Sequence, residues 1–193
     1  MAVAVATKRW TLEELDSLPD DGNTYELIHG ELFVTPPPTD GHDTIAARLT
    51  RILDPFVERN GLGLIYRPRA VIQLSDSQVE PDLQVRQAPA GREFTWRTAP
   101  LPSLVVEVLS PSTGRRDREH KRRLYLDLGV PEYWIVDPEA GTITSIRADR
   151  EDVTSGGQMT WSPPGAAAHR SVPPPDSAPA SHRARRSSRH RRR

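Results

Sequence analysis

Two acidic residues and one lysine have the types and positions that metal-assisted chemistry requires. Asp82 lies near the start of a predicted strand over residues 81–86, and Glu107 lies inside a predicted strand over residues 101–109. Glu107 is flanked by valines and a leucine, so its strand is predicted to be buried. An ionised carboxylate is costly there unless it is paired or binds a metal. The competing interpretation of both residues is that they are ordinary surface acids.

Lys121 is the third candidate, because its residue type is rare in this chain. The chain has 26 basic residues, of which only Lys8 and Lys121 are lysines. Arginine is a broad planar fork that keeps its proton, whereas lysine is a compact charge whose pKa can shift, so a lysine in an arginine-rich chain favours a chemical role. At about 100° per residue, Lys121 projects onto the middle of the apolar face of a predicted helix over residues 115–128. Two structural alternatives stay open: the side chain extends its charge to the surface, or it pairs with Asp117.

These three residue types suit hydrolysis assisted by a divalent metal. Two carboxylates hold Mg²⁺ through hard oxygen ligands. The metal polarises a phosphodiester and acidifies a water molecule, while a lysine orients that water or stabilises developing negative charge. We therefore expect Asp82, Glu107 and Lys121 to converge near strand ends, with Mg²⁺ as the cofactor and Mn²⁺ as its substitute.

The elements that must position these residues follow an α/β pattern, a mixed sheet flanked by helices. The pattern predicts helices over residues 11–18, 40–60 and 115–128, a hairpin over 25–34 that turns at His29-Gly30, and strands over 64–74, 81–86, 101–109, 133–136 and 142–147, the last of them an edge strand. The near-continuous apolar run at 101–109 is typical of a strand covered on both faces. Glu107 is therefore expected inside the sheet.

Composition divides the chain near residue 165. Residues 1–165 have the pattern of one domain, whereas residues 166–193 hold Ala, Pro, Ser, His and Arg with one Val as the only large apolar residue. Such a segment lacks the apolar side chains for a core, so we expect it to be disordered. The chain has no cysteine, which excludes disulfides and thiolate metal sites.

The net charge of zero hides an uneven distribution. Residues 170–193 carry eight arginines and one acid, while the rest of the chain carries 18 basic and 25 acidic residues. Arginines of the tail, among them Arg183, Arg185 and Arg186, are candidates for contacts to nucleic-acid phosphates. The alternative is that the tail arose from a reading-frame accident in an arginine-rich genome.

Nothing in the sequence indicates a membrane or secreted protein. No apolar run approaches the roughly 20 residues that a membrane-spanning helix needs. The opening MAVAVATKRW is too short, and is followed too soon by charge, to be a secretory signal. We expect the protein in the cytoplasm.

Several motifs carry a family resemblance. They are YELIHGEL, a helix with His42, EPDL, LVVEVLSPST, the Lys121 helix and GVPEYWIVDP, which together span roughly residues 10–164. This series resembles the Uma-type family of restriction endonuclease-like proteins, a branch of the PD-(D/E)XK nuclease superfamily. The resemblance implies a restriction-endonuclease-like PD-(D/E)XK core and a metal-dependent endonuclease that hydrolyses DNA phosphodiester bonds.

The resemblance also assigns roles to individual residues. The superfamily pattern is Asp, then Glu or Asp, one residue, then Lys, but Leu109 stands where that lysine is expected. Proteins that resemble this one supply the lysine from the following helix, where Lys121 stands. Asp82 therefore carries over as the motif aspartate, Glu107 as the motif acid and Lys121 as the relocated lysine.

Three further residues are implied in the same way. Glu26, in YELIHGEL, is a further metal ligand or else an exposed hairpin acid. His42 matches a helix-start histidine of the family and is either an accessory residue or an ordinary polar residue of a helix N-terminus. Glu80 is a reserve candidate, because it would point the same way as Asp82 if both lay in one strand.

Two functions compete on this evidence. The first is a Mg²⁺-dependent endodeoxyribonuclease, which the complete Asp82, Glu107 and Lys121 set favours. The second is a catalytically inactive nucleic-acid-binding or interaction protein that retains the nuclease fold, to which the acidic body and the divergent C-terminal segment give weight. A scaffold without nucleic acid is a third interpretation. DNA is the expected partner, although the sequence does not separate DNA from RNA, and a homodimer is expected only because restriction-type nucleases often cut as dimers.

Overall fold

The structure is a computed structural model that describes residues 8–87, 95–156, 158–163 and 170–172. The elements follow in the order α1 (Leu12–Asp16), β1 (Thr24–Ile28), β2 (Glu31–Thr35), α2 (Asp40–Arg59), β3 (Leu64–Tyr66), β4 (Ile72–Gln73), β5 (Gln78–Val79), β6 (Leu83–Arg86), β7 (Leu104–Val108), α3 (Gly114–Arg116), η1 (Asp117–Lys121), α4 (Arg122–Asp127), β8 (Tyr133–Asp137), β9 (Thr142–Ile146), β10 (Val153–Ser155), β11 (Met159–Trp161) and β12 (Arg170–Val172). Within these described ranges, no helix has the length and apolar character needed to cross a membrane.

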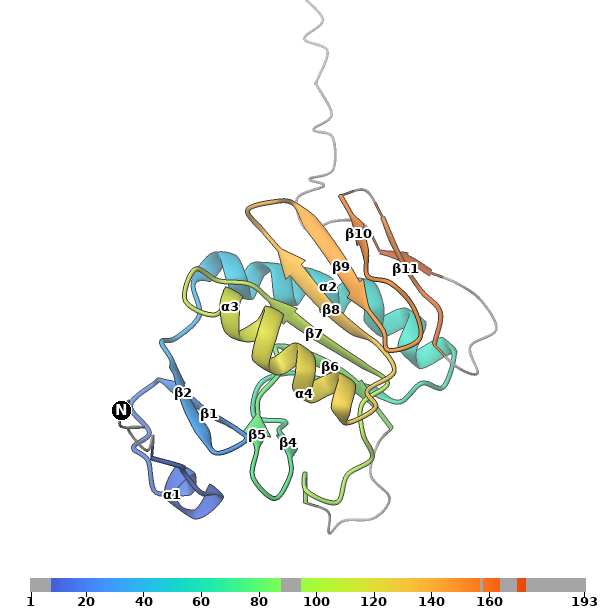
Figure 1. The fold of residues 1–193 in the computed structure, drawn as a ribbon. Helices are drawn as coiled ribbons and strands as arrows, with labels where there is room; N and C mark the ends of the chain where they lie inside the picture. Colours follow the sequence, from blue (N-terminus) through green and yellow to red (C-terminus); the bar gives the residue numbers. More distant parts are fainter. Residues whose placement is uncertain (1–7, 88–94, 157, 164–169, 173–193) are drawn as a thin grey trace, which may run out of the picture.

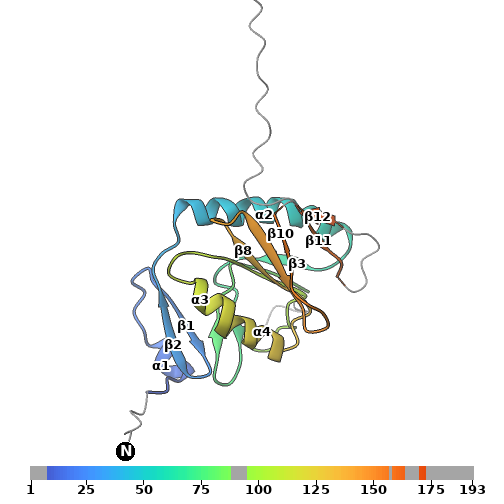
Figure 2. The same ribbon diagram turned by 45° about the horizontal axis from the view of Figure 1, so that its top comes forward.

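A mixed sheet forms the centre of the molecule (Figure 1). Among the described residues it has six strands in the order β10-β9-β8-β7-β6-β3. β7 and β8 pair in parallel, and the other neighbours pair antiparallel. A parallel pair needs a crossover connection, and the helical segment from α3 to α4 provides it. The long helix α2 covers one face of the sheet and this crossover covers the other (Figure 2).

The alternation of side chains along β7 decides which way Glu107 points. Val106 and Val108 pack in the apolar cluster that contains residues of α2, whereas Val105 packs in the cluster that contains Leu124 of α4. Successive side chains of a strand point to opposite faces. Glu107 therefore faces the crossover helix, which carries Lys121.

A smaller sheet closes the same side of the molecule. In the described part of the chain its strands lie in the order β2-β1-β5-β4. The β1–β2 hairpin turns at His29 and Gly30, with φ of 49° and 77°. Two consecutive residues with positive φ are the signature of the tight hairpin turn that the sequence predicts. The hairpin brings Glu26 of β1 toward the crossover helix.

Two predicted strands are shorter than expected. The strand expected over residues 64–74 is divided into β3 and β4, because Pro68 lacks an amide hydrogen and Arg69 adopts a φ of 82°. The strand expected from residue 81 begins only at Leu83, so Glu80 and Asp82 both lie in the connection before β6. The condition under which Glu80 would share the direction of Asp82 is therefore not met.

The C-terminal part of the sheet also differs from the prediction. β9 was expected at the edge, but β10 pairs with its outer side. Three-residue strands such as β10 are too short to show an alternating pattern, so they could not be predicted from periodicity. β11 pairs with β12, at residues 170–172, which lie inside the segment expected to be disordered. The other residues of that segment, including the candidates Arg183, Arg185 and Arg186, lie outside the described residues.

Candidate active site

A cavity of about 310 Å³ opens where the hairpin, the start of α2, the end of β7 and the crossover helix meet. Its wall includes all six residues that the sequence singled out in the body of the protein: Glu26, His42, Glu80, Asp82, Glu107 and Lys121. These residues come from segments up to 95 positions apart, so only the fold brings them together.

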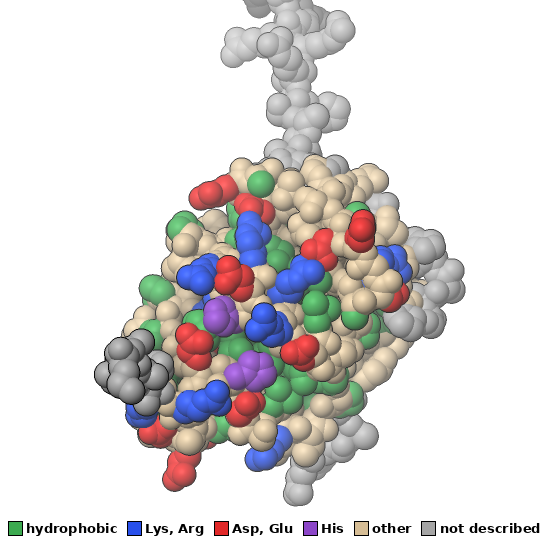
Figure 3. Space-filling model, in the orientation of Figure 1, with side chains coloured by type: hydrophobic (Ala, Val, Ile, Leu, Met, Phe, Trp, Pro, Cys, Tyr) green, Lys and Arg blue, Asp and Glu red, His purple; other side chains and the backbone are tan. Residues whose placement is uncertain are grey.

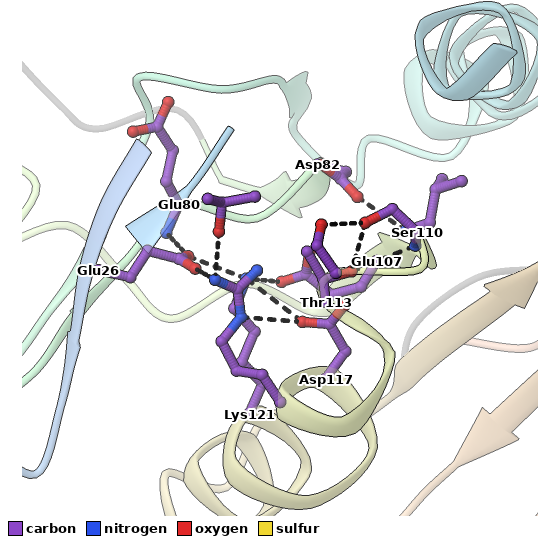
Figure 4. Close-up of polar contacts among 12 residues, drawn as sticks. Glu26, Glu80, Asp82, Glu107, Ser110, Thr113, Asp117 and Lys121 are labelled. Carbon is purple, nitrogen blue, oxygen red and sulfur yellow. Dashed lines mark hydrogen bonds and ion pairs between the residues drawn. The ribbon is translucent and has the colours of Figure 1, made fainter. Parts of the chain in front are cut away.

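Two contacts hold Asp82 beside the C-terminal end of β7. Its Oδ2 accepts a hydrogen bond from the backbone N–H of Val108 at 2.7 Å (Figure 4). The same oxygen lies 3.1 Å from Nε2 of His42. The first contact fixes Asp82 beside Glu107, since Val108 is the next residue in the strand. The carboxylate of Asp82 also raises the pKa of His42, chiefly through the hydrogen bond between them.

Lys121 is buried among carboxylates and does not extend to the surface. Its Nζ donates a hydrogen bond to Oε1 of Glu107 at 2.8 Å and forms an ion pair with Oε1 of Glu26 at 2.9 Å. Asp117 lies farther away, at 3.9 Å. Burial by itself lowers the pKa of Lys121, but the carboxylates around it outweigh that effect and raise the pKa above its ordinary value.

Glu107 occupies the least favourable position of the group. The residue is 3 % exposed, and burial raises the pKa of its carboxyl to about 8 even though Lys121 opposes the shift. Tyr125 donates a second hydrogen bond to the same oxygen, Oε1, at 2.8 Å. A buried acid with a raised pKa in the wall of a cavity is a mark of a functional site.

Arg116, Glu26 and Asp117 surround the ion pair of Lys121 and Glu107. Arg116 forms an ion pair with Oε2 of Glu26 at 3.0 Å, and its Nε donates to Oδ1 of Asp117 at 3.4 Å. In Figure 4 the carboxylates of Glu26, Glu107 and Asp117 gather around the helix of Lys121, whereas the side chain of Glu80 points away from it. Glu80 instead accepts a hydrogen bond from the backbone of Arg69.

Arg116 was not predicted as a site residue, and the shape of the helix explains why. The segment Asp117–Lys121 forms a wide π turn between the short helix α3 and α4. A regular projection at 100° per residue separates Arg116 from Lys121 by about 140°. The extra residue in the turn changes that phase, so both side chains reach one cavity. π turns of this kind are frequent at functional sites.

The two carboxylates of the predicted motif fit a hydrated divalent cation. Both described contacts of Asp82 use Oδ2, and both hydrogen bonds of Glu107 use Oε1. Each carboxylate thus keeps one oxygen without a hydrogen bond from the described residues. No group of three or more His, Cys, Asp or Glu in the described ranges is arranged to hold a metal. Mg²⁺ keeps several waters and can be bound by one or two carboxylates with substrate phosphates, which matches the donor chemistry of Asp82 and Glu107.

The site lies in a chain that matches a known family along most of its length. The Uma2 family model, described as "Putative restriction endonuclease", matches residues 12–174. The chain belongs to the Uma2 family. This assignment confirms the family resemblance of the motifs.

Solved structures show that the fold is shared as well. A nuclease from Anabaena variabilis, described as putative and as belonging to DUF820, matches this Uma2 chain with a TM-score of 0.69 at 20 % sequence identity. The match covers 83 % of this chain and 94 % of that chain. No curated protein matches the sequence. Family and fold together indicate a restriction-endonuclease-like nuclease, as the sequence predicted, and a nuclease acts on nucleic acid.

Proposed function

We propose that this Uma2 protein is a Mg²⁺-dependent endonuclease that hydrolyses DNA phosphodiester bonds, with Asp82, Glu107 and Lys121 as its active-site residues. The observation that carries the proposal is the buried Lys121 ammonium, bonded to Glu107 in the wall of a cavity that Asp82 also lines. A lysine and two acids in one cavity form the set that the family motif requires, although the lysine comes from the crossover helix.

The charge of the site favours a cation. Glu26, Glu107 and Asp117 are buried acids, and Lys121 and Arg116 are the cations that face them. When Glu107 is ionised, the acids exceed these cations by one; without a further cation, burial raises the pKa of Glu107 to about 8. Asp82, outside this count, adds a further acid. Ionising a buried acid in excess of its cationic partners is costly, and a divalent ion would offset that cost and favour the ionised form of Glu107.

Asp82 and Glu107 are the residues that would hold the ion. When bound, Mg²⁺ polarises the phosphodiester and makes a water molecule more acidic. Val108 and His42 fix the direction of Asp82, and Tyr125 and Lys121 fix that of Glu107. Such second contacts keep ligands oriented before the ion arrives.

Lys121 supplies a positive charge that is fixed in place. An ammonium has three N–H donors, and the two carboxylates within 3 Å engage two of them. The third is available to orient the attacking water or to stabilise charge on the phosphate. Because Lys121 is held by Glu26 and Glu107, no reorganisation is needed during the reaction.

The face of the molecule drawn in Figure 3 has a mixed charge among the described residues. On the face in Figure 3, acidic and basic side chains of the described residues are interspersed. We expect the phosphate at the cleavage site to be recognised by a few groups inside the cavity and by the bound ion.

The proposal is tested by cleavage of supercoiled plasmid DNA by the full chain with Mg²⁺, with Mn²⁺ and with a chelator. We expect nicked and linear products with either metal and none with the chelator. Asp82→Asn and Glu107→Gln should each abolish cleavage. Glu119→Gln is the matched control, because Glu119 is an exposed acid of the same helical segment that pairs with Arg115.

Three results would contradict the proposal. Cleavage that persists in the chelator would remove the metal from the mechanism. DNA retardation on a gel without cleavage would favour the non-catalytic binding protein. Cleavage of RNA, but not of DNA, under the same conditions would change the substrate.

A further inference from the structure

Arg116 is a second cation in the wall of the cavity, and it is held more rigidly than a surface arginine. Its side chain is 10 % exposed. Nη1 contacts Oε2 of Glu26 and donates to Oγ1 of Thr35, while Nε donates to Asp117. These three acceptors come from β1, from the end of β2 and from the π turn, so the plane of the guanidinium is fixed by three separate segments.

The contacts leave one end of the guanidinium open. Arginine has five N–H donors, and the described contacts engage Nε and Nη1. Nη2 donates no hydrogen bond to any described residue, and it is not one of the buried polar atoms that lack a partner. Arg86 differs in this respect, because its Nε and Nη1 are buried and have no hydrogen-bond partner among the described residues. Nη2 of Arg116 therefore presents two donors to the cavity.

A cavity rich in acids needs such a group to accept a phosphate. A phosphodiester that approaches Glu26, Glu107 and Asp82 is repelled by their charge until cations offset it. A guanidinium suits phosphate oxygens, because its donors form a fixed fork with matching geometry. Glu26 and Asp117 orient Arg116 in advance, which makes its contribution larger than that of a mobile side chain.

We propose that Arg116 binds a non-bridging oxygen of the phosphate at the cleavage site through Nη2. The inference rests on the proposed nuclease function, since it names the group that receives the substrate phosphate at the same site. In this arrangement Lys121 lies beside the proposed metal ligand Glu107, and Arg116 contacts the phosphate from the side of the β1–β2 hairpin. A purely structural Arg116 would only neutralise Glu26 and Asp117, a task that lysine can also perform.

The test compares Arg116→Lys with Arg115→Lys. The first change keeps a positive charge beside Glu26 but removes Nη2, and the second alters a neighbouring arginine that is 84 % exposed and pairs with Glu119. The probe is thymidine 5′-monophosphate, titrated into each full-length protein in Ca²⁺ and followed by calorimetry. We expect about tenfold weaker binding for Arg116→Lys, in line with one lost charge-assisted contact worth roughly 1.5 kcal/mol, and less than twofold change for Arg115→Lys.

Cleavage of DNA in Mg²⁺ provides a separate measurement. Arg116→Lys should lower kcat by about 10²–10³, as loss of an oriented donor does, while KM changes much less. If the wild-type protein binds the nucleotide through Arg116 but cuts no DNA, the proposed function fails and the phosphate site stands. If the wild type cuts DNA and Arg116→Lys binds and cuts as the wild type does, the function stands and the inference about Arg116 is overturned.

Folding of the variants is checked by circular dichroism and thermal melting. Arg116→Gln is the second variant, because it keeps two N–H donors without the charge. If both Arg116 variants are unfolded while Arg115→Lys is folded, the guanidinium is required for folding and the inference is wrong. A wild-type protein that does not bind the nucleotide at all overturns it as well.

Discussion

Replacing Lys121 by arginine tests whether the buried lysine is chemical or structural. The side chain is 1 % exposed and lies within 3 Å of two carboxylate oxygens. Arginine keeps the charge, so Glu107 and Glu26 retain a counterion. The larger guanidinium must still enter a filled site, which costs about 1–3 kcal/mol through overpacking. In a chain of this size that lowers the thermal midpoint by about 2–4 °C per kcal/mol.

The rate should respond far more than the stability. A planar fork does not place a water or meet developing charge as an ammonium does, and losing one positioned group costs about 10²–10³ in rate. Nuclease activity and thermal midpoint are measured together in Mg²⁺ and in Mn²⁺. Lys8→Arg is the matched control, because Lys8 is an exposed lysine that pairs with Glu14, and it should change neither quantity. A folded Lys121→Arg protein that cuts DNA within about threefold of the wild-type rate would refute the catalytic role.

Three further predictions follow from the same contacts. In metal-free buffer the thermal midpoint should fall as pH rises from 4.5 toward 8. The reason is that burial raises the pKa of Glu107 to about 8, so the folded protein holds a proton that the unfolded chain has lost. Glu107→Gln should remove this pH dependence, and a wild-type midpoint that does not fall would contradict the prediction. His42→Gln should weaken Mn²⁺ binding in calorimetry by about 10–100-fold, since His42 orients Asp82, whereas His29→Gln in the exposed hairpin turn should not; equal affinities would show that the contact is incidental. Removing residues 173–193 should flatten the salt dependence of DNA binding, measured by fluorescence anisotropy, since those residues include seven arginines; an unchanged slope would exclude the tail as a binding element.

The sequence predicted the parts of the site that depend on residue type and local pattern. Lys121 was identified by its rarity and by its position on an apolar helical face, and the structure confirms its burial. Glu107 was predicted to be buried because of its apolar neighbours in one strand, which the structure also confirms. Both signals are local, since they need only a helical or strand period. The roles of these residues stay predictions until activity is measured.

The contacts between distant segments could not be predicted in the same way. Glu26 meets Arg116 only because the hairpin folds against the crossover helix. The π turn that brings Arg116 to the cavity changes the phase of the helix by one residue, and a regular period does not contain that change. The strand expected from residue 81 begins only at Leu83, so Glu80 and Asp82 lie in a connection whose side-chain directions a strand period does not predict.

The location of a bound ion tests the central claim most directly. Crystals of the full chain soaked in Mn²⁺ would show the ion by its anomalous scattering. The account predicts a peak in the cavity that is bonded to one oxygen of Asp82 and one oxygen of Glu107, with Lys121 still bonded to Glu107. A well-occupied peak elsewhere on the protein, with none between these two carboxylates, would contradict it.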